Sequence, residues 1–163
     1  MAPMSLTTQS LSSSYYARDQ ITAFHLAQEA IESIRHARDN NVLKNALGIL
    51  TDGRQTDLLE DIPKNTDFIV DTTNDDDMDS DACDNGCPVL RKSSDGLYGY
   101  GSNWTPTQFT RTVRATFVPV AETPSDEIKL TVTVSWQTGS FRTRSFTISD
   151  NLYRWVNDGS AER

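Results

Sequence analysis

The sequence predicts an α+β domain in which one long N-terminal helix packs on an antiparallel β-meander, with an irregular acidic segment between them. Two patterns support this class. Apolar residues recur at helical spacing over residues 18–41, and apolar and polar residues alternate strictly further along, from about residue 109. The segment between them is rich in Asp and follows neither period. A chain of 163 residues suits one domain with an extended helix better than two full domains.

The helix prediction rests on an apolar stripe along residues 18–41. The stripe repeats at steps of three or four residues and consists of Ile21, Phe24, Ala27, Ile31 and Ile34. Residues 5–14 are rich in Ser and Thr, which form helices only moderately well, and they extend the predicted helix to 5–41. We expect Asn40-Asn41 to stop or kink it, with a second short helix over 42–50. Because the stripe begins well before the domain body, part of it is expected to face another protein.

The acidity of the chain is concentrated in one segment. The net charge is −8, and residues 61–90 alone carry nine acidic side chains against a single Lys. We expect residues 51–105 to be irregular, with a short strand over 67–71. An exposed acidic loop is expected over 74–86, because like charges at this density repel one another. No basic surface suited to nucleic acid is visible, so nucleic acid is not a predicted partner.

Four Asp residues alternate within the acidic loop, as they do at the start of calcium-binding loops. They are Asp75, Asp77, Asp79 and Asp81. An EF-hand counted from Asp75 would need Gly where Ser80 stands and Glu where Gly86 stands. The favoured interpretation is therefore a solvated acidic surface and no cofactor, with a calcium site as the alternative.

Cys83 and Cys87 are the only cysteines of the chain. Their spacing allows a small disulfide loop, as expected in an oxidising compartment. Two free, exposed thiols remain the alternative. A four-cysteine zinc site would need two more Cys, and the acidic surroundings disfavour a reactive thiolate.

The C-terminal part predicts three sequential strands that form a meander over 109–149. The strands are expected over 111–120, 127–137 and 140–149. In the middle strand the apolar residues, all expected on one buried face, are Ile128, Leu130, Val132, Val134 and Trp136. Turns are expected at 123–126 and at Thr138-Gly139. A final turn over 150–156, capped by Asp150-Asn151, is expected to pack back on the sheet.

The sequence gives no sign of an active site. His25 and His36 lie eleven residues apart on the predicted helix, which places them roughly 16 Å apart along its axis, too far to share a metal ion. The chain has no nucleophile elbow, phosphate-binding loop or zinc-protease motif. We therefore predict that the protein is not an enzyme.

The helix sequence resembles a known family. The run ITAFHLAQEAIESIR at residues 21–35, followed by RDNN at 38–41, is similar to the end of the long helix in minor type IV pilins and pseudopilins. The pilus modification protein V class is the most similar. Residues 108–113, QFTRTV, resemble the start of that family's first meander strand, and residues 127–136 with 146–155 resemble its last strands. The acidic loop is not covered by the resemblance.

This resemblance implies a pilin-like fold and a structural role as a subunit of a bacterial type IV filament, with other pilin subunits as partners through the helix. Such proteins carry a leader peptide and an apolar helix half that anchors them in the inner membrane before assembly. We accordingly expect such a segment upstream of this chain, a cell-surface or extracellular location, and a monomer without that segment. The alternative function is a secreted calcium-dependent binding or adhesion module that uses the Asp-rich loop.

Overall fold

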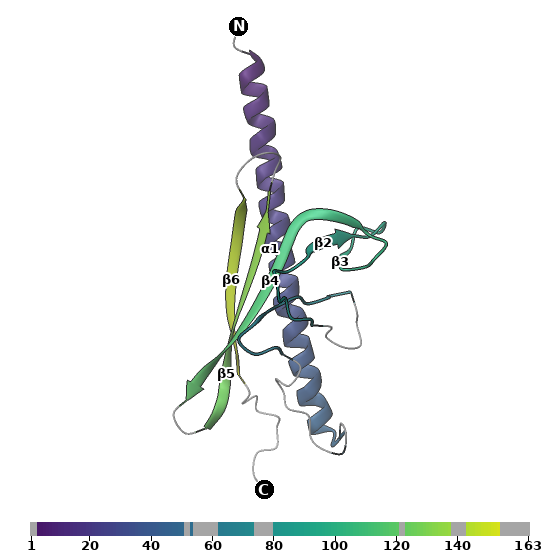
Figure 1. The fold of residues 1–163 in the computed structure, drawn as a ribbon, viewed down its shortest axis with the longest axis vertical. Coiled ribbons are helices and arrows are strands. Elements are labelled where there is room, and N and C mark those ends of the chain that lie inside the picture. The colour runs from purple at the N-terminus through teal and green to yellow at the C-terminus, as the bar shows by residue number, and fades with distance from the viewer. Residues whose placement is uncertain are drawn as a thin grey trace.

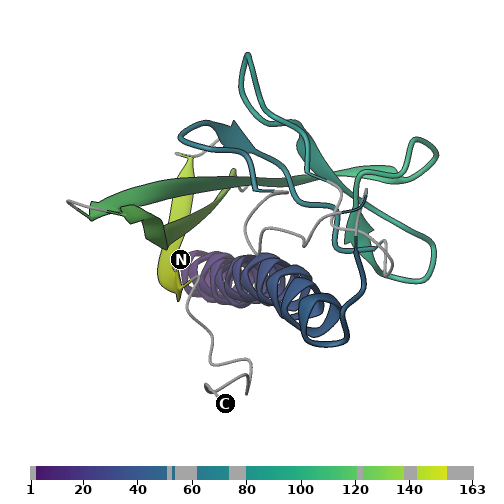
Figure 2. The same cartoon turned by 90° about the horizontal axis from the view of Figure 1, so that it is seen from below.

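The computed structural model describes residues 3–50, 53, 62–73, 80–120, 123–137 and 143–153. Over these residues an N-terminal helix, α1 (Pro3–Ala46), lies along a six-stranded antiparallel sheet (Figure 1). The predicted α+β class is therefore confirmed. Figure 2, which views the molecule from below, shows α1 covering one face of the sheet.

Helix α1 is longer than the sequence predicts. Its 44 residues span about 66 Å at the usual helical rise. The expected stop at Asn40-Asn41 is wrong, because Asn41 lies on the buried side of α1, where packing outweighs its weak helix propensity. The helix instead ends at Ala46 and is followed by Gly48, whose φ of 69° allows a left-handed cap. There the Gly48 amide donates to Asn45 and the Ile49 amide to Lys44.

The C-terminal strands form the predicted meander, with shifted boundaries. In chain order they are β4 (Thr105–Val120), β5 (Thr123–Trp136) and β6 (Arg144–Tyr153). Each pairs antiparallel with the next, for example Val113 with Val132 and Val132 with Ile148. The five apolar residues of β5 are all buried, as their alternation predicts.

Two predicted turns are wrong. Residues 123–126 belong to β5, because Val120 pairs directly with Thr123 and leaves only residues 121 and 122 between the strands. The expected C-terminal turn over 150–156 is replaced by strand as far as Tyr153, where Leu152 pairs with Ile128 and is buried. The predicted turn at Thr138-Gly139 and the last part of the C-terminal turn, 154–156, lie outside the described residues.

The other edge of β4 is covered by short strands from the segment predicted to be irregular. They are β1 (Asp67–Phe68), β2 (Val89–Lys92) and β3 (Tyr98–Gly99). Strand β2 pairs with the first part of β4, β3 pairs with β2, and β1 pairs with β4 at Val113 and Arg114. Only β1 overlaps a strand expected from the sequence, and it is shorter than the expected 67–71.

The N-terminal part of α1 extends beyond the sheet (Figure 1). Side chains 10–18 are all exposed, whereas burial against the sheet begins at Asp19. We call residues 3–18 the overhang of α1. Up to Ala17 it contains no charged residue, and the exposed large side chains between residues 10 and 18 are Leu11, Tyr15 and Tyr16. Within the described part of the chain, no helix combines the length and apolar character needed to cross a membrane.

Candidate functional site: the base of the acidic loop and the face of the helix

The two ends of the acidic segment are joined by backbone pairing. Phe68 forms a β-bridge with Ala82, the Ile69 amide donates to the Asp81 carbonyl at 2.9 Å, and the Cys83 amide donates to the Asp67 carbonyl at 2.7 Å. We call residues 67–69 and 81–83 the loop base. Because Asp67 and Phe68 also pair with β4, the loop base is an extension of the main sheet.

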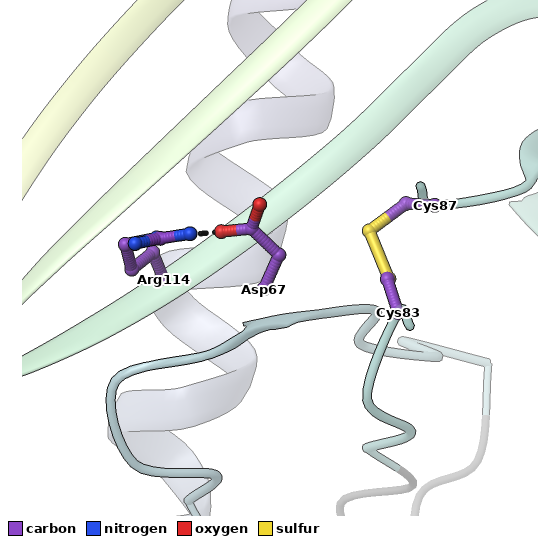
Figure 3. Close-up of a disulfide and its surroundings, with 4 residues drawn as sticks. All are labelled: Asp67, Cys83, Cys87 and Arg114. Carbon is purple, nitrogen blue, oxygen red and sulfur yellow. Dashed lines mark hydrogen bonds and ion pairs between the residues drawn. A yellow bond between two sulfur atoms is a disulfide. The ribbon is translucent and has the colours of Figure 1, made fainter. Parts of the chain in front are cut away.

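A disulfide fixes the chain immediately after the loop base. Cys83 and Cys87 are bonded, with 5.0 Å between their Cα atoms (Figure 3). The predicted disulfide is thus formed. Gly86 within this small ring has a φ of 94°, a conformation that favours glycine. Cys83 belongs to the loop base and Cys87 lies two residues before β2, so the bond ties the returning end of the acidic segment to the sheet.

An ion pair lies on the outer face of the sheet beside the disulfide. Asp67 and Arg114 are cross-strand partners, and the Arg114 Nε donates to Asp67 Oδ1 at 2.6 Å (Figure 3). This hydrogen bond, followed by the attraction of the two charges, raises the pKa of Arg114 above its ordinary value. Both side chains are about half exposed, so solvent screens the pair and its main effect is to orient the two groups.

On the inner face, Arg111 of β4 is completely buried. One of its terminal nitrogens donates to the Leu26 carbonyl of α1 at 3.0 Å and the other to the Val70 carbonyl at 2.7 Å. Glu29 lies 3.4 Å from the first nitrogen. Arg111 therefore joins three parts of the molecule through one side chain: the helix, the sheet and residues 70–73. We call residues 70–73 the outgoing arm of the acidic segment.

The same arm makes two further polar contacts. The Thr72 hydroxyl donates to Glu29 Oε1 at 2.7 Å, and Asp71 Oδ1 accepts from both the amide and the hydroxyl of Thr73. The arm also packs closely on β3, because a Cβ added at Gly99 would lie 3.0 Å from the Thr73 methyl group. The described part of the arm is thus fixed to α1 and to β3.

Tyr100 lies near this polar cluster, and its hydroxyl is buried without a hydrogen-bond partner among the described residues. Burial raises the pKa of Tyr100 above 10.0, while the nearby positive charge of Arg111 acts in the opposite direction and is outweighed. The neutral phenol is therefore the form that the fold favours.

Of the four Asp residues of the possible calcium site, the structure describes only Asp81. Asp75, Asp77 and Asp79 lie outside the described residues. Asp81 is exposed, and its carbonyl belongs to the loop base. Within the described ranges, no group of three or more His, Cys, Asp or Glu side chains is placed to hold a metal ion.

The predicted stripe of α1 is divided between two environments. Ala27, Ile31 and Ile34 are buried against the sheet, but Ile21 and Phe24 are 59% and 39% exposed. Phe24 retains an edge-on contact with Phe146 of β6, with ring centroids 5.6 Å apart. Three of the five stripe residues therefore lie in the core, while Ile21 and Phe24 are the part of the stripe left available for contact outside the domain.

The face that α1 buries is rotated relative to the predicted stripe. Its apolar members are Ala23, Leu26, Ala27, Ala30, Ile31 and Ile34. Small alanines allow the helix to approach the sheet closely, yet they contribute little to an apolar pattern in the sequence. Sequence reasoning also missed Arg111, although its position in strict alternation with Phe109, Val113 and Ala115 places it on the inner face.

A shallow cleft between α1 and β6 is too small for most ligands. Its volume is about 160 Å³, whereas small-molecule sites usually exceed about 300 Å³. Arg35 lines it and is held by Asp150 at 2.9 Å and by Glu32 at 2.7 Å. The charges of Arg35, Glu32 and Asp150 pair with one another. The cleft is therefore better described as the junction between α1 and β6 than as a binding site.

Searches for a matching family model, a related curated protein and a similar solved structure each found no match.

Proposed function

We propose that this chain is a non-enzymatic structural subunit, a minor pilin or pseudopilin, of a bacterial type IV filament. Its partners would be other pilin subunits. The protein would first be a precursor in the inner membrane and would then be located at the cell surface or outside the cell. The resemblance of residues 21–41 to the pilin helix suggests this function. The order of elements, a long helix followed by an antiparallel sheet, is compatible with a pilin-like fold.

The observation that carries the proposal is the overhang of α1. Its side chains from residue 10 onward are exposed, and no charged group precedes Arg18. An isolated helix of this length is marginal in water, so packing on another protein would stabilise it. Exposed apolar groups at Leu11 and Tyr15 offer such a contact. Ile21 is also exposed, where α1 already lies along the domain.

The proposal needs no reaction, and the polar clusters support a structural role. Arg111 is enclosed by backbone carbonyls and Glu29, so it is not offered to a substrate. The small cleft beside Arg35 is likewise lined by charges that already pair. A calcium-dependent adhesion module gains no specific support from the described residues.

The coding sequence upstream of this chain provides a first test. The proposal expects a leader peptide followed by about 20 predominantly apolar residues, the length of a membrane-spanning helix. These residues should continue in helical register into the overhang. An upstream sequence without such an apolar segment would contradict the proposal.

A further inference from the structure

The disulfide ring contains the only Asn-Gly dipeptide of the chain, Asn85-Gly86. Both residues are exposed, and they follow Asp84 in the turn that the Cys83–Cys87 bond closes. Asn followed by Gly is the dipeptide in which the next backbone nitrogen reaches the side-chain amide most easily, because glycine has no side chain to obstruct the approach. Here that dipeptide lies on the surface of the most acidic segment.

The folded ring leaves the attacking nitrogen accessible. No hydrogen bond of the Gly86 amide occurs among the described residues. Gly86 has a φ of 94°, and, apart from Asn85 and Cys87, no described residue has an atom within 4 Å of the place where its Cβ would stand. Among the described residues, no hydrogen bond therefore holds this nitrogen away from Asn85. We propose that Asn85 is a site of spontaneous deamidation in the folded protein.

The reaction needs only the chain and water. The Gly86 nitrogen, after losing its proton to solvent, attacks the side-chain carbonyl carbon of Asn85 and forms a five-membered succinimide. The bond from that carbon to the side-chain nitrogen breaks, and ammonia leaves with a proton from water. Water then adds to either ring carbonyl, giving aspartate when the new ring bond opens and isoaspartate when the original backbone bond opens.

Asp95-Gly96 provides a comparison within the same structure. It would form the same succinimide by loss of water, and Gly96 also has a positive φ, of 91°. However, the Gly96 amide donates to the Ser93 carbonyl at 3.2 Å. This hydrogen bond must break before the nitrogen can attack, so we expect residue 85 to react and residue 95 to remain unchanged over the same time.

The modification changes both the charge and the shape of the ring. Either product adds one negative charge to a chain whose net charge is −8. Isoaspartate also passes the backbone through the side chain, which lengthens the ring between Cys83 and Cys87. Because Cys87 leads directly into β2, the change occurs beside the loop base. This inference is independent of the filament proposal.

Ageing of the purified, disulfide-intact protein in mildly alkaline buffer tests the proposal. Samples are separated by ion exchange, digested without reduction and mapped by mass spectrometry, with an isoaspartate-specific assay on the peptide that holds residues 83–87. We expect a more acidic species to accumulate with time, its added mass confined to that peptide. The Asn85→Gln variant should not form it, because its ring closure would require a less favourable six-membered imide.

Two outcomes would overturn the proposal. One is an Asn85 amide that persists in the folded protein while it is lost from the reduced, unfolded chain under the same conditions, which would mean that the fold protects it. The other is equal accumulation of the acidic species in wild type and Asn85→Gln, which would place the reaction elsewhere. Melting curves of fresh wild type and variant serve as the folding control.

Discussion

Arg111 brings a positive charge into the core, where burial of an ion is unfavourable unless hydrogen bonds replace its water. The Leu26 and Val70 carbonyls supply those bonds, and Glu29 supplies a counter-charge at the edge. The Arg111 Nε has no partner among the described residues, so this N–H group has lost its water without gaining a hydrogen bond there. The planar guanidinium can nevertheless reach two carbonyls from different elements at once, which the single nitrogen of Lys cannot do as well.

Replacing Arg111 with Met should therefore destabilise the protein strongly. The Val70 carbonyl would lose its donor, while the Leu26 carbonyl would keep only its hydrogen bond within α1, and we expect the free energy of unfolding to fall by about 1–3 kcal/mol. Arg114→Met on the same strand is the matched control, because Arg114 is half exposed and its loss leaves Asp67 in solvent. Urea denaturation of both variants makes the comparison. Equal effects of the two substitutions would show that Arg111 does not join the elements as described.

The buried Tyr100 predicts that the free energy of unfolding depends on pH in the alkaline range. Because burial raises its pKa above 10.0, the unfolded chain releases this proton at a lower pH than the native state does. Stability from this group is fully present below pH 10.0 and is lost as the pH rises through the pKa of the folded state. The slope of unfolding free energy against pH above 10.0 should be steeper for wild type than for Tyr100→Phe. Identical slopes would argue against a buried, neutral phenol.

At the scale of elements, α1 has two different sides. One side, from Ala23 to Asn41, packs on the sheet. Another carries Ile21 and the half-exposed Phe24. The overhang reaches the sheet at Tyr16, whose ring lies 4.2 Å from the guanidinium of Arg144 in β6. The residues of α1 that pack on the sheet are therefore largely separate from those that we propose for contact with other proteins.

Matched alanine substitutions on the two sides should behave differently. Ile31→Ala removes a nearly buried side chain and should lower the free energy of unfolding by about 2–4 kcal/mol. Ile21 is 59% exposed, so Ile21→Ala should change it by no more than about 0.5 kcal/mol. Chemical denaturation of the two variants measures the difference. A larger loss for Ile21 than for Ile31 would contradict the assignment of the buried face.

The disulfide stabilises the junction between the loop base and β2. Its ring is small, with a sequence separation of four, so the restriction of the unfolded chain is modest. The double replacement Cys83→Ser with Cys87→Ser should lower the free energy of unfolding by about 2 kcal/mol. Hydrogen exchange at the Ile69 and Cys83 amides should also accelerate, because both belong to the loop base. Unchanged exchange would mean that the loop base holds without the disulfide.

The sequence predicted those elements whose periodicity is strong and largely local. Strand β5 shows this best, since its alternation is complete and all its apolar residues are buried. Strand β1 was expected, although over the longer range 67–71. Strands β2 and β3 could not be predicted, because two to four residues are too few to show a period. The end of α1 was misplaced for a related reason, since Asn41 is held in the helix by tertiary packing.

The candidate site was predictable only in part. The close spacing of Cys83 and Cys87 indicated a disulfide, which the structure forms. The Arg111 cluster joins residues 26, 29, 70 and 111, and no local pattern in the sequence brings such distant positions together. The buried face of α1 differs from the predicted stripe because alanines form much of that face. A hydrophobicity pattern gives alanine little weight, so the sequence does not reveal it.

At the scale of the whole molecule, the loop base and the overhang lie in different places. The loop base lies beside β4, while the overhang, which carries no charged residue before Arg18, extends from the end of the domain (Figure 1). Like charges on the acidic segments of neighbouring subunits would repel if they met. An assembly through the helix would thus be favoured in arrangements that keep these segments on the outside.

We propose that the overhang of α1 binds other subunits of a filament. Filaments sheared from cells that produce the full-length protein test it most directly, with Leu11→Asp as the variant and Leu97→Asp as its control. The two leucines are similarly exposed, at 53% and 57%, but Leu97 lies between β2 and β3. We predict equal melting temperatures for both variants, with wild type and Leu97→Asp in the filament fraction and Leu11→Asp missing from it. Normal incorporation of Leu11→Asp, or absence of the wild-type chain from filaments, would contradict the account.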